Sequence, residues 1–303
     1  EWAALRLSLQ TQLVQTYIEL QTLNEHAHIL ERNLESYHRV LKITQNRYDL
    51  GVVTRSDVSQ ALTQLKSTQA QYLSLNSQRS RLLHSLAVLV GQPATGFELE
   101  QVANLLSMPP LPKELPSTLL ERRPDIAAAE RRVIAANAEI GVAKTAYFPS
   151  FTFNAAGGYR ADQWSGLINT PNRFWSIGPQ FDLRIFDAGA RKAKSQQAQA
   201  AYDQQVANYR QTTLQAIAEV EDALVQLMNL KSEYAVQQQA QEAALDALHL
   251  IESQYQAGLV DYLSVSNAQT TALNAERTLL DLKASQLTAS VQLISALGGG
   301  WEP

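Results

Sequence analysis

The sequence predicts a mainly α-helical fold in which long antiparallel coiled-coil helices are interrupted by one β-hairpin of the transmembrane type. Three observations predict it. Two stretches of the chain repeat each other at a fixed spacing, long stretches lack both glycine and proline, and one segment alternates apolar and polar residues with a period of two. Such patterns are the primary sequence signals for repeats, helices and strands.

The repeat has no gap. The residues around Tyr48 read RYDLGVVTRSDVSQA, and those around Tyr255 read QYQAGLVDYLSVSNA. Both Gly258 − Gly51 and Gly298 − Gly91 give an offset of 207 residues. A gapless duplication indicates a duplicated architecture. The block at about 121–207 has no counterpart before the first copy, so we expect this chain to be a C-terminal fragment of a longer protein.

Composition excludes several kinds of site. A net charge of −4 argues against a nucleic-acid partner, which needs a basic face. No cysteine is present, so disulfides and thiolate metal sites are excluded. His26 and His28 do not share a helix face, and the other histidines are scattered, so no metal site is predicted. No constellation supports an enzyme, and no cofactor is expected.

Long helices are predicted where glycine and proline are absent, at residues 1–50, 52–90 and 190–257. A helix over 190–257 would span about 100 Å and needs a partner along its length. Apolar residues recur every seventh position from Leu13 through Leu20 to Leu41, as in a coiled-coil seam. On these helices alone, a soluble antiparallel coiled-coil scaffold is the favoured interpretation.

The helices are predicted to turn back at Gly51 and Gly258, since glycine accepts the left-handed conformation that ends a helix. The gapless repeat predicts that both turns lie at the same end of the molecule. The segments expected are a first helical hairpin at 1–90, a proline-rich connection at 91–118, a helix at 119–147, a transmembrane hairpin with its external loop at 148–187, and a second helical hairpin with a C-terminal tail at 188–303.

The hairpin is predicted from two alternating runs of strand length. One run extends from Phe151 to Tyr159, and the other from Trp175 to Ile185, each with apolar and aromatic residues on one face. Runs of about 9–11 residues with this alternation are typical of transmembrane barrels. A lipid-exposed sheet must close into a barrel, so several copies of the chain would have to contribute strands. The alternative is a soluble hairpin that lies on a core.

The run LLERRPDIAAAERRVIAANAEIGVAKTAYFPSF at 119–151 resembles the outer-membrane factor family of tripartite efflux pumps, the TolC/OprM-like channels. Its Arg123-Pro124-Asp125-Ile126 motif is similar to the NodT-type lipoprotein branch that serves RND transporters. Two further motifs carry the resemblance, which covers the whole chain: FDAG at 186–189 and ALGGGW at 296–301.

The resemblance implies a homotrimer in the outer membrane of a Gram-negative bacterium, with four strands per full protomer in a twelve-stranded β-barrel. The helices would form a periplasmic α-barrel, and a cysteine in the missing N-terminal part would carry a lipid anchor. The implied function is a passive exit duct for drugs or other small toxic molecules. A periplasmic adaptor, also called a membrane fusion protein, and an inner-membrane RND transporter would open it on docking. Protein secretion (type I) or metal-ion efflux through the same fold are alternatives.

The resemblance also implies site residues at the two helical turns. The pore gate would lie at Leu263, Ser264 and Asn267, where many members carry an acidic ring at the position of Asn267. Leu263 could instead be a coiled-coil core residue.

Two further expectations concern the same turns. Ser56 and Asp57 match a family position that holds the gate shut through an aromatic partner, here Tyr255, although helix capping competes as an explanation. The adaptor is expected to contact residues at the turns themselves: Tyr48, Gly51, Val52, Gly258 and Leu259.

Overall fold

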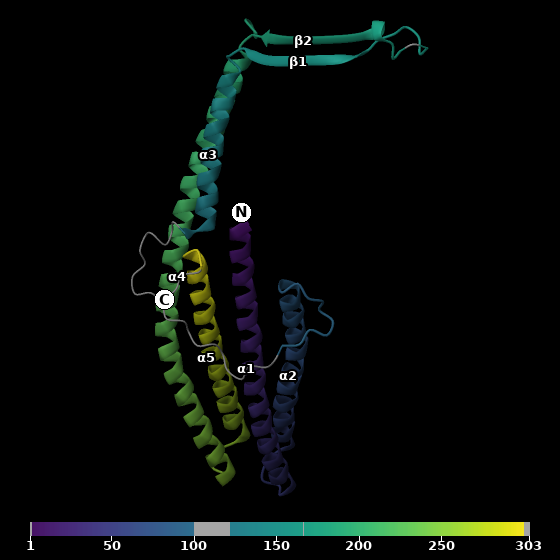
Figure 1. Ribbon diagram of the computed structural model, residues 1–303. Helices are drawn as coiled ribbons and strands as arrows, with labels where there is room; N and C mark the ends of the chain where they lie inside the picture. The colour runs from purple at the N-terminus through teal and green to yellow at the C-terminus, as the bar shows by residue number, and fades with distance from the viewer. Residues whose placement is uncertain (1, 100–121, 166, 300–303) are drawn as a thin grey trace. The chain divides into compact units, whose positions relative to one another are not determined.

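Two helical hairpins form the first of two structural units (Figure 1). The computed structural model describes residues 2–99, 122–165 and 167–299. The first unit comprises residues 1–124 and 215–303, and the second comprises 125–214. In the first unit, α1 (Trp2–Asp49) and α2 (Arg55–Leu89) form one hairpin. The C-terminal part of α4 (Ala190–Ala257) and α5 (Tyr262–Ala296) form the other.

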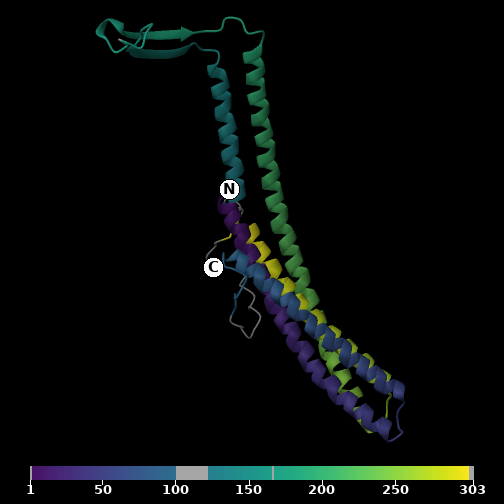
Figure 2. The same cartoon turned by 90° about the vertical axis from the view of Figure 1, so that its right-hand side faces the viewer.

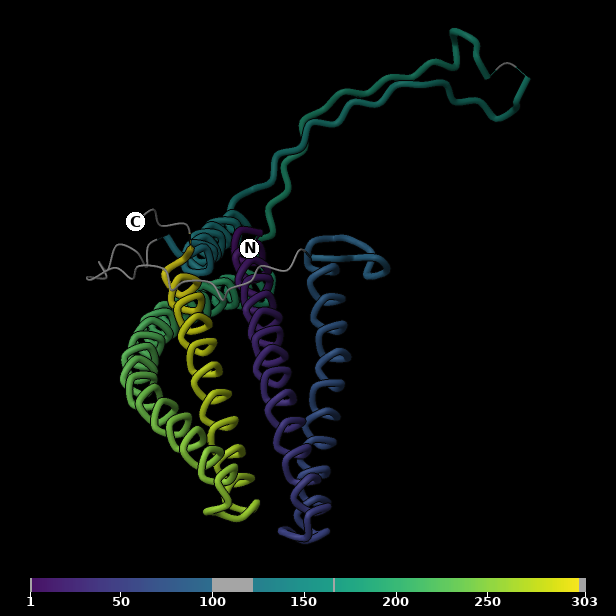
Figure 3. Tube along the Cα trace, turned by 90° about the horizontal axis from the view of Figure 1, so that it is seen from below, coloured from purple at the N-terminus to yellow at the C-terminus, as the bar shows by residue number. Residues whose placement is uncertain are grey.

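Helix α1 packs against both α2 and α5, so the first helix of one repeat contacts the second helix of the other (Figure 3). Both helical turns lie at the same end of this unit, as the repeat predicts (Figure 2). Leu20, which lies on the predicted seven-residue series, is almost fully buried, and so is Tyr37. A cluster beside the turns joins both repeats through five buried residues: Val40, Ala61, Tyr255, Tyr262 and Val265.

The second unit contains α3 (Pro124–Thr145), β1 (Ser150–Tyr159), the 3-10 turn η2 (Thr170–Asn172), β2 (Arg173–Asp182) and the N-terminal part of α4. Helix α3 begins at Pro124 rather than at residue 119, because proline lacks an amide hydrogen and favours the first helical position. Residues 119–121, most of the predicted proline-rich connection, and Gly300 and Trp301 lie outside the described residues.

Strands β1 and β2 pair antiparallel, with Ala155 opposite Ile177 near the middle of the ladder. Opposite residues share a face, so the predicted apolar faces of the two runs coincide. The second strand ends at Asp182, whereas the sequence predicted that it reaches Ile185. The ladder stops there because Asp182 pairs with Ser150, the first residue of β1, and no β1 residue remains to pair with 183–185.

Among the described residues, no helix combines the length and the apolar character needed to cross a membrane.

Candidate functional site

The two helical turns have the same backbone geometry. Gly51 and Gly258 have φ values of +75° and +82°. The amide of Val52 donates to the carbonyl of Arg47 at 2.9 Å, and the amide of Leu259 donates to that of Gln254 at 2.9 Å. These bonds satisfy carbonyls that the helix end leaves free. The repeat therefore reproduces each turn down to its hydrogen bonds.

The helices that follow the two turns are capped at equivalent positions of the repeat, but the hydroxyl and the carboxylate exchange places between these positions. In the first repeat the cap residue is Thr54, and the Asp57 carboxylate accepts from the Thr54 amide at 2.8 Å. In the second repeat the cap residue is Asp261, whose carboxylate accepts from the amide and hydroxyl of Ser264 at 3.0 and 2.7 Å. Asp57 and Ser264 thus both serve helix capping, the alternative that the sequence left open for Asp57.

Tyr255 joins the two repeats beside the turns. Its side chain is 1% exposed, and its hydroxyl lies 2.8 Å from Oγ1 of Thr44. The Arg47 guanidinium covers its ring at 4.8 Å, a cation–π contact. A methyl group on Gly258 would lie 2.8 Å from Nη2 of Arg47, so glycine leaves room for this arginine.

Within the chain, the Tyr255 hydroxyl is therefore paired with Thr44, and the described hydrogen bonds of Asp57 are to Thr54. Thr44 and Arg47 were not singled out from the sequence. The signal was present, because Arg47 belongs to the repeated RYDLG segment and has no basic counterpart at Gln254.

The predicted gate residues lie on the exposed side of α5. Leu263 is 55% exposed, and Asn267, one helical turn later, is also exposed. The opposite side of the same turns is buried at Tyr262 and Val265. Leu263 is therefore not a core residue of this chain.

Apolar side chains also project from the turns. Leu50, Val52 and Leu259 are all exposed. A methyl group added at Gly51 would have no atom within 4 Å, so the surroundings of this glycine are open.

Charges near the turns are set by local contacts. Hydrogen bonds from the side chain and amide of Ser264 hold the pKa of Asp261 below its ordinary value, which keeps this cap ionised. Burial raises the pKa of Tyr262 to about 12, and burial also raises the pKa of Tyr37. Both phenols therefore stay neutral around pH 7.

The Arg-Pro-Asp-Ile motif closes the other end of the first unit. The buried Arg123 side chain donates to the carbonyl of Ala296 at 2.9 Å and contacts the Glu219 carboxylate at 2.8 Å. A methyl group on Gly298 would lie 3.2 Å from the Arg123 backbone nitrogen. The motif thus caps the C-terminal end of α5 and joins it to α4.

In the second unit, a tight turn connects β2 to α4. The Asp187 carboxylate accepts from the amides of Gly189 and Arg191 at 3.1 and 3.0 Å and from Nε of Arg191 at 2.6 Å. The bonds from Arg191 hold the pKa of Asp187 below its ordinary value. Ala188 and Gly189 have positive φ, which explains the small residues of the FDAG motif.

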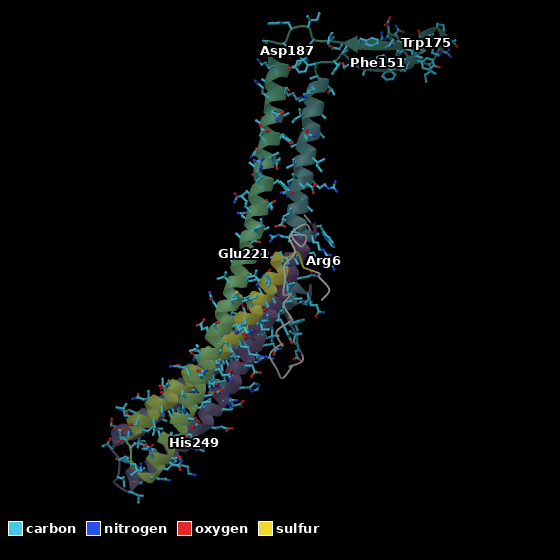
Figure 4. The ribbon with its side chains drawn as sticks, turned by 90° about the vertical axis from the view of Figure 1, so that its left-hand side faces the viewer. Arg6, Phe151, Trp175, Asp187, Glu221 and His249 are labelled. Atoms are coloured by element: carbon cyan, nitrogen blue, oxygen red, sulfur yellow. The ribbon has the colours of Figure 1, made fainter. Side chains whose placement is uncertain are left out.

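The hairpin exposes its apolar face. Figure 4 shows Phe151 and Trp175 on the strands and Asp187 beyond β2. Exposed large side chains cover this face: Phe151, Phe153, Trp175, Ile177 and Phe181. On the other face, Nδ2 of Asn154 donates to Oε1 of Gln180 at 3.3 Å. One face therefore suits an apolar medium and the other suits water.

The described part of the chain holds no group of three or more histidine, cysteine, aspartate or glutamate side chains able to bind an ion.

Comparison with known proteins gives consistent matches. The sequence model of the family described as "Outer membrane efflux protein" matches residues 1–92 and 115–299. The chain is 32% identical over 301 residues to the "Pyoverdine export outer membrane protein OpmQ" of Pseudomonas aeruginosa, with 99% of this chain and 63% of the relative covered. It is 34% identical to the "Toluene efflux pump outer membrane protein TtgC" of Pseudomonas putida over 90% of this chain and 57% of the relative.

Solved structures match as well. The fold is similar to that in "Structural insights of the outer-membrane channel OprN", with a TM-score of 0.90, 30% identity, and 99% of this chain and 68% of that chain covered. The chain spans 57–63% of the length of the two curated relatives, OpmQ and TtgC.

Proposed function

The chain belongs to the outer membrane efflux protein family, and from that membership we propose that the full protein is the outer-membrane channel of a tripartite efflux pump. Members of this family are efflux channels rather than enzymes, and we propose the same for this protein: a passive duct without catalysis. Its location is the outer membrane.

The observation that carries the proposal is the β-hairpin. Its apolar face is exposed over the whole ladder, and its polar face carries Asn154 and Gln180. The described sheet has two strands, so each strand has one edge without a strand partner in the described part of the chain. A lipid-exposed edge is not tolerated, so strands from other segments and copies must complete a barrel. The proposed assembly is a homotrimer with a twelve-stranded barrel.

The proposed partners are a periplasmic adaptor protein and an inner-membrane RND transporter. The exposed Leu50, Val52 and Leu259 at the helical turns provide a surface that an adaptor can cover. Single exposed apolar residues are common, but three on adjacent turns favour an interaction site.

The proposed gate lies at the same turns. Exposure of Leu263 and Asn267 supports a position where side chains of several copies meet. Asp57 and Ser264 would hold the turns in shape through their caps, and Ser56 is exposed beside Asp57. A hydrogen bond between Asp57 and Tyr255 that holds the gate shut stays a prediction.

The proposed cargo is drugs or other small toxic molecules. The two curated relatives are named for pyoverdine and toluene, which are chemically unlike, so their names do not select a narrower cargo.

The test places a charge on each face of the hairpin. Ile177→Arg lies on the apolar face near mid-strand, where an arginine in lipid costs about 2–4 kcal/mol per copy. Ser176→Arg is the matched control on the other face. We expect Ile177→Arg to abolish assembly of the full-length protein in outer-membrane fractions and Ser176→Arg to preserve it. Equal assembly of both variants would contradict the barrel.

A further inference from the structure

Within β1 and β2, the apolar face of the hairpin carries a single charged side chain, that of Arg173. Alternate residues of the paired strands form this face: Phe151, Phe153, Ala155, Gly157 and Tyr159 of β1, and Arg173, Trp175, Ile177, Pro179 and Phe181 of β2. All the others are apolar or aromatic. A charge on a face that meets lipid is least costly near the membrane surface, so the place of Arg173 along the strand is informative.

Arg173 lies at the loop end of the hairpin. The other end of each strand leads into a helix, since α3 ends at Thr145 and α4 begins at Ala190 (Figure 1). Eight residues separate Phe181 from Arg173 (181 − 173 = 8), which is about 27 Å along the strand. At the tilt of a barrel strand this distance becomes about 20 Å along the membrane normal, close to the height of the apolar band.

Aromatic side chains lie at both ends of this face. Phe151 and Phe181 pair at the helix end, with ring centroids 4.9 Å apart. Tyr159 and Trp175 are exposed at the loop end. Tyrosine and tryptophan favour the level of the lipid headgroups, because their rings are amphipathic. Arg173 therefore lies at headgroup level, and in a channel whose helices extend into the periplasm the loop end faces the outer leaflet.

The Arg173 guanidinium is exposed, and its side chain has no hydrogen bond or ion pair in the described part of the chain. Its backbone is held, since the Arg173 amide donates to the carbonyl of Thr170. Arg160, the other arginine at this end, lies on the opposite face with its guanidinium 5.3 Å from the Phe174 ring. Only Arg173 thus offers an unpaired fork of donors to the lipid side.

We propose that Arg173, Tyr159 and Trp175 bind the phosphorylated sugar headgroup of a glycolipid in the outer leaflet. The guanidinium holds a phosphate group through two parallel hydrogen bonds. Tyr159 is directly opposite Arg173 in the ladder, and Trp175 follows it on the same face, so the three side chains are neighbours. The site rests on the proposed barrel, because only that assembly places this face in lipid.

Charge complementarity selects a phosphate-bearing headgroup. The planar guanidinium fork matches the geometry of phosphate, whereas a neutral headgroup would leave the Arg173 charge unpaired. The two flanking residues favour a sugar beside the phosphate. The rings of Tyr159 and Trp175 combine flat apolar faces with one O–H and one N–H donor, which suit the mixed C–H and O–H surface of a sugar ring.

The experiment measures lipid binding to the full-length protein, purified as the assembled oligomer in detergent, by native mass spectrometry. Three lipids are compared: bisphosphorylated lipid A, the same lipid A after removal of its phosphates, and phosphatidylglycerol, which has a phosphate but no sugar. Arg173→Gln removes the charge. Arg160→Gln is the matched control, since it removes the same charge from the opposite face at the same end of the hairpin.

We expect Arg173→Gln to bind bisphosphorylated lipid A about tenfold more weakly than the parent protein, because hydrogen bonds to a charged group are lost. Arg173→Lys should recover part of the affinity, and Arg160→Gln should match the parent protein. Removing the phosphates from the lipid should abolish the difference between the parent protein and Arg173→Gln. The parent protein should also prefer bisphosphorylated lipid A to phosphatidylglycerol, and Trp175→Leu should reduce that preference.

Equal affinity of the parent protein and Arg173→Gln for bisphosphorylated lipid A would overturn the site, and so would an equal loss in Arg160→Gln. A difference that persists after the phosphates are removed would show that Arg173 pairs with protein and not with lipid. Equal affinity for lipid A and phosphatidylglycerol would overturn the role of the sugar. Failure of the parent protein to assemble in outer-membrane fractions would overturn the barrel, whereas an assembled protein without phosphate-dependent binding overturns only this site.

Discussion

Tyr255 and its repeat counterpart Tyr48 have opposite surroundings, since Tyr255 is buried against Thr44 and Arg47 while Tyr48 is exposed. The Thr44 hydroxyl donates to the carbonyl of Val40 at 2.9 Å, so its one hydrogen is already used. The Tyr255 hydroxyl must therefore donate to Thr44 Oγ1. Removing the Thr44 hydroxyl therefore leaves the Tyr255 donor without an acceptor, whereas removing the Tyr255 hydroxyl leaves the Thr44 donor bonded to Val40.

Thr44→Val is expected to cost about 1–3 kcal/mol of stability, because it leaves the buried Tyr255 hydroxyl without an acceptor. Tyr255→Phe should cost less, since the Thr44 hydroxyl keeps its bond to Val40. The double variant should be close to Tyr255→Phe. Thermal unfolding of the full-length protein in detergent measures the order.

Thr44→Ser is the control for that order, because serine keeps the hydroxyl and loses only the methyl group. A Thr44→Val variant no less stable than Tyr255→Phe would contradict the assigned donor.

Tyr262 predicts a pH dependence. Burial raises its pKa to about 12 from an ordinary 10, so the folded protein holds the phenol proton more tightly than the unfolded chain. The associated stability is complete below pH 10 and is lost as the pH rises through about 12. Tyr262→Phe should show a smaller fall in unfolding temperature between pH 9 and pH 12 than the parent protein.

Tyr202→Phe serves as the comparison, since it removes a half-buried phenol from α4 without touching the turns. Parallel curves for Tyr262→Phe and the parent protein would assign the alkaline loss to other groups.

At the scale of the helices, the capping positions explain why sequence left the role of Asp57 open. A carboxylate three residues after a cap threonine suits a capping box and a gate hydrogen bond equally well. The structure shows the capping box. The second repeat exchanges hydroxyl and carboxylate between the same positions, Asp261 and Ser264, which shows that the positions serve capping whichever residue carries the charge.

The end of α5 depends on Arg123. Arg123→Met is expected to cost about 1.5–3 kcal/mol, because the Ala296 carbonyl loses a charged donor. Glu219→Gln should cost at most about 1 kcal/mol, since Glu219 is more than half exposed and solvent screens the ion pair. Thermal unfolding of both variants distinguishes the cap from the ion pair.

Equal destabilisation by Arg123→Met and Glu219→Gln would show that the ion pair, and not the helix cap, is the contribution of the motif.

The two strands show which features an alternation of apolar and polar residues can predict. Alternation predicted both strands and the shared face, which pairing of Phe151 with Phe181 confirms. It did not predict the end of β2 at Asp182. Leu183 and Ile185 continue the alternation, but a strand also needs a partner, and the start of β1 at Ser150 sets where the partner begins.

At the scale of the whole assembly, the proposed gate would be formed by several copies together. Asn267 carries no charge, so we expect millimolar Mg²⁺ to leave the conductance of the full-length channel nearly unchanged. Asn267→Asp would place one carboxylate per copy at the exposed side of α5 and should make Mg²⁺ reduce the conductance several-fold.

Gln60→Asp is the matched control, because it adds the same charge at the exposed, repeat-equivalent position on α2. If Mg²⁺ acts equally on both variants, or on neither, the position of the gate at Asn267 is wrong.

The sequence by itself determined the long helices, the two glycine turns at one end, the membrane-type hairpin and the family, because periodicity, glycine placement and motifs act locally along the chain. Only the tertiary structure decided that Tyr255 pairs with Thr44, that Arg47 lies over its ring, that Arg123 caps α5, and which α4 residues stay uncovered. Those contacts join residues far apart in the sequence: Arg123 and Ala296 are separated by 173 positions, and Thr44 and Tyr255 by 211. A local pattern specifies which face of a helix is apolar, but the partner of that face depends on how distant helices pack.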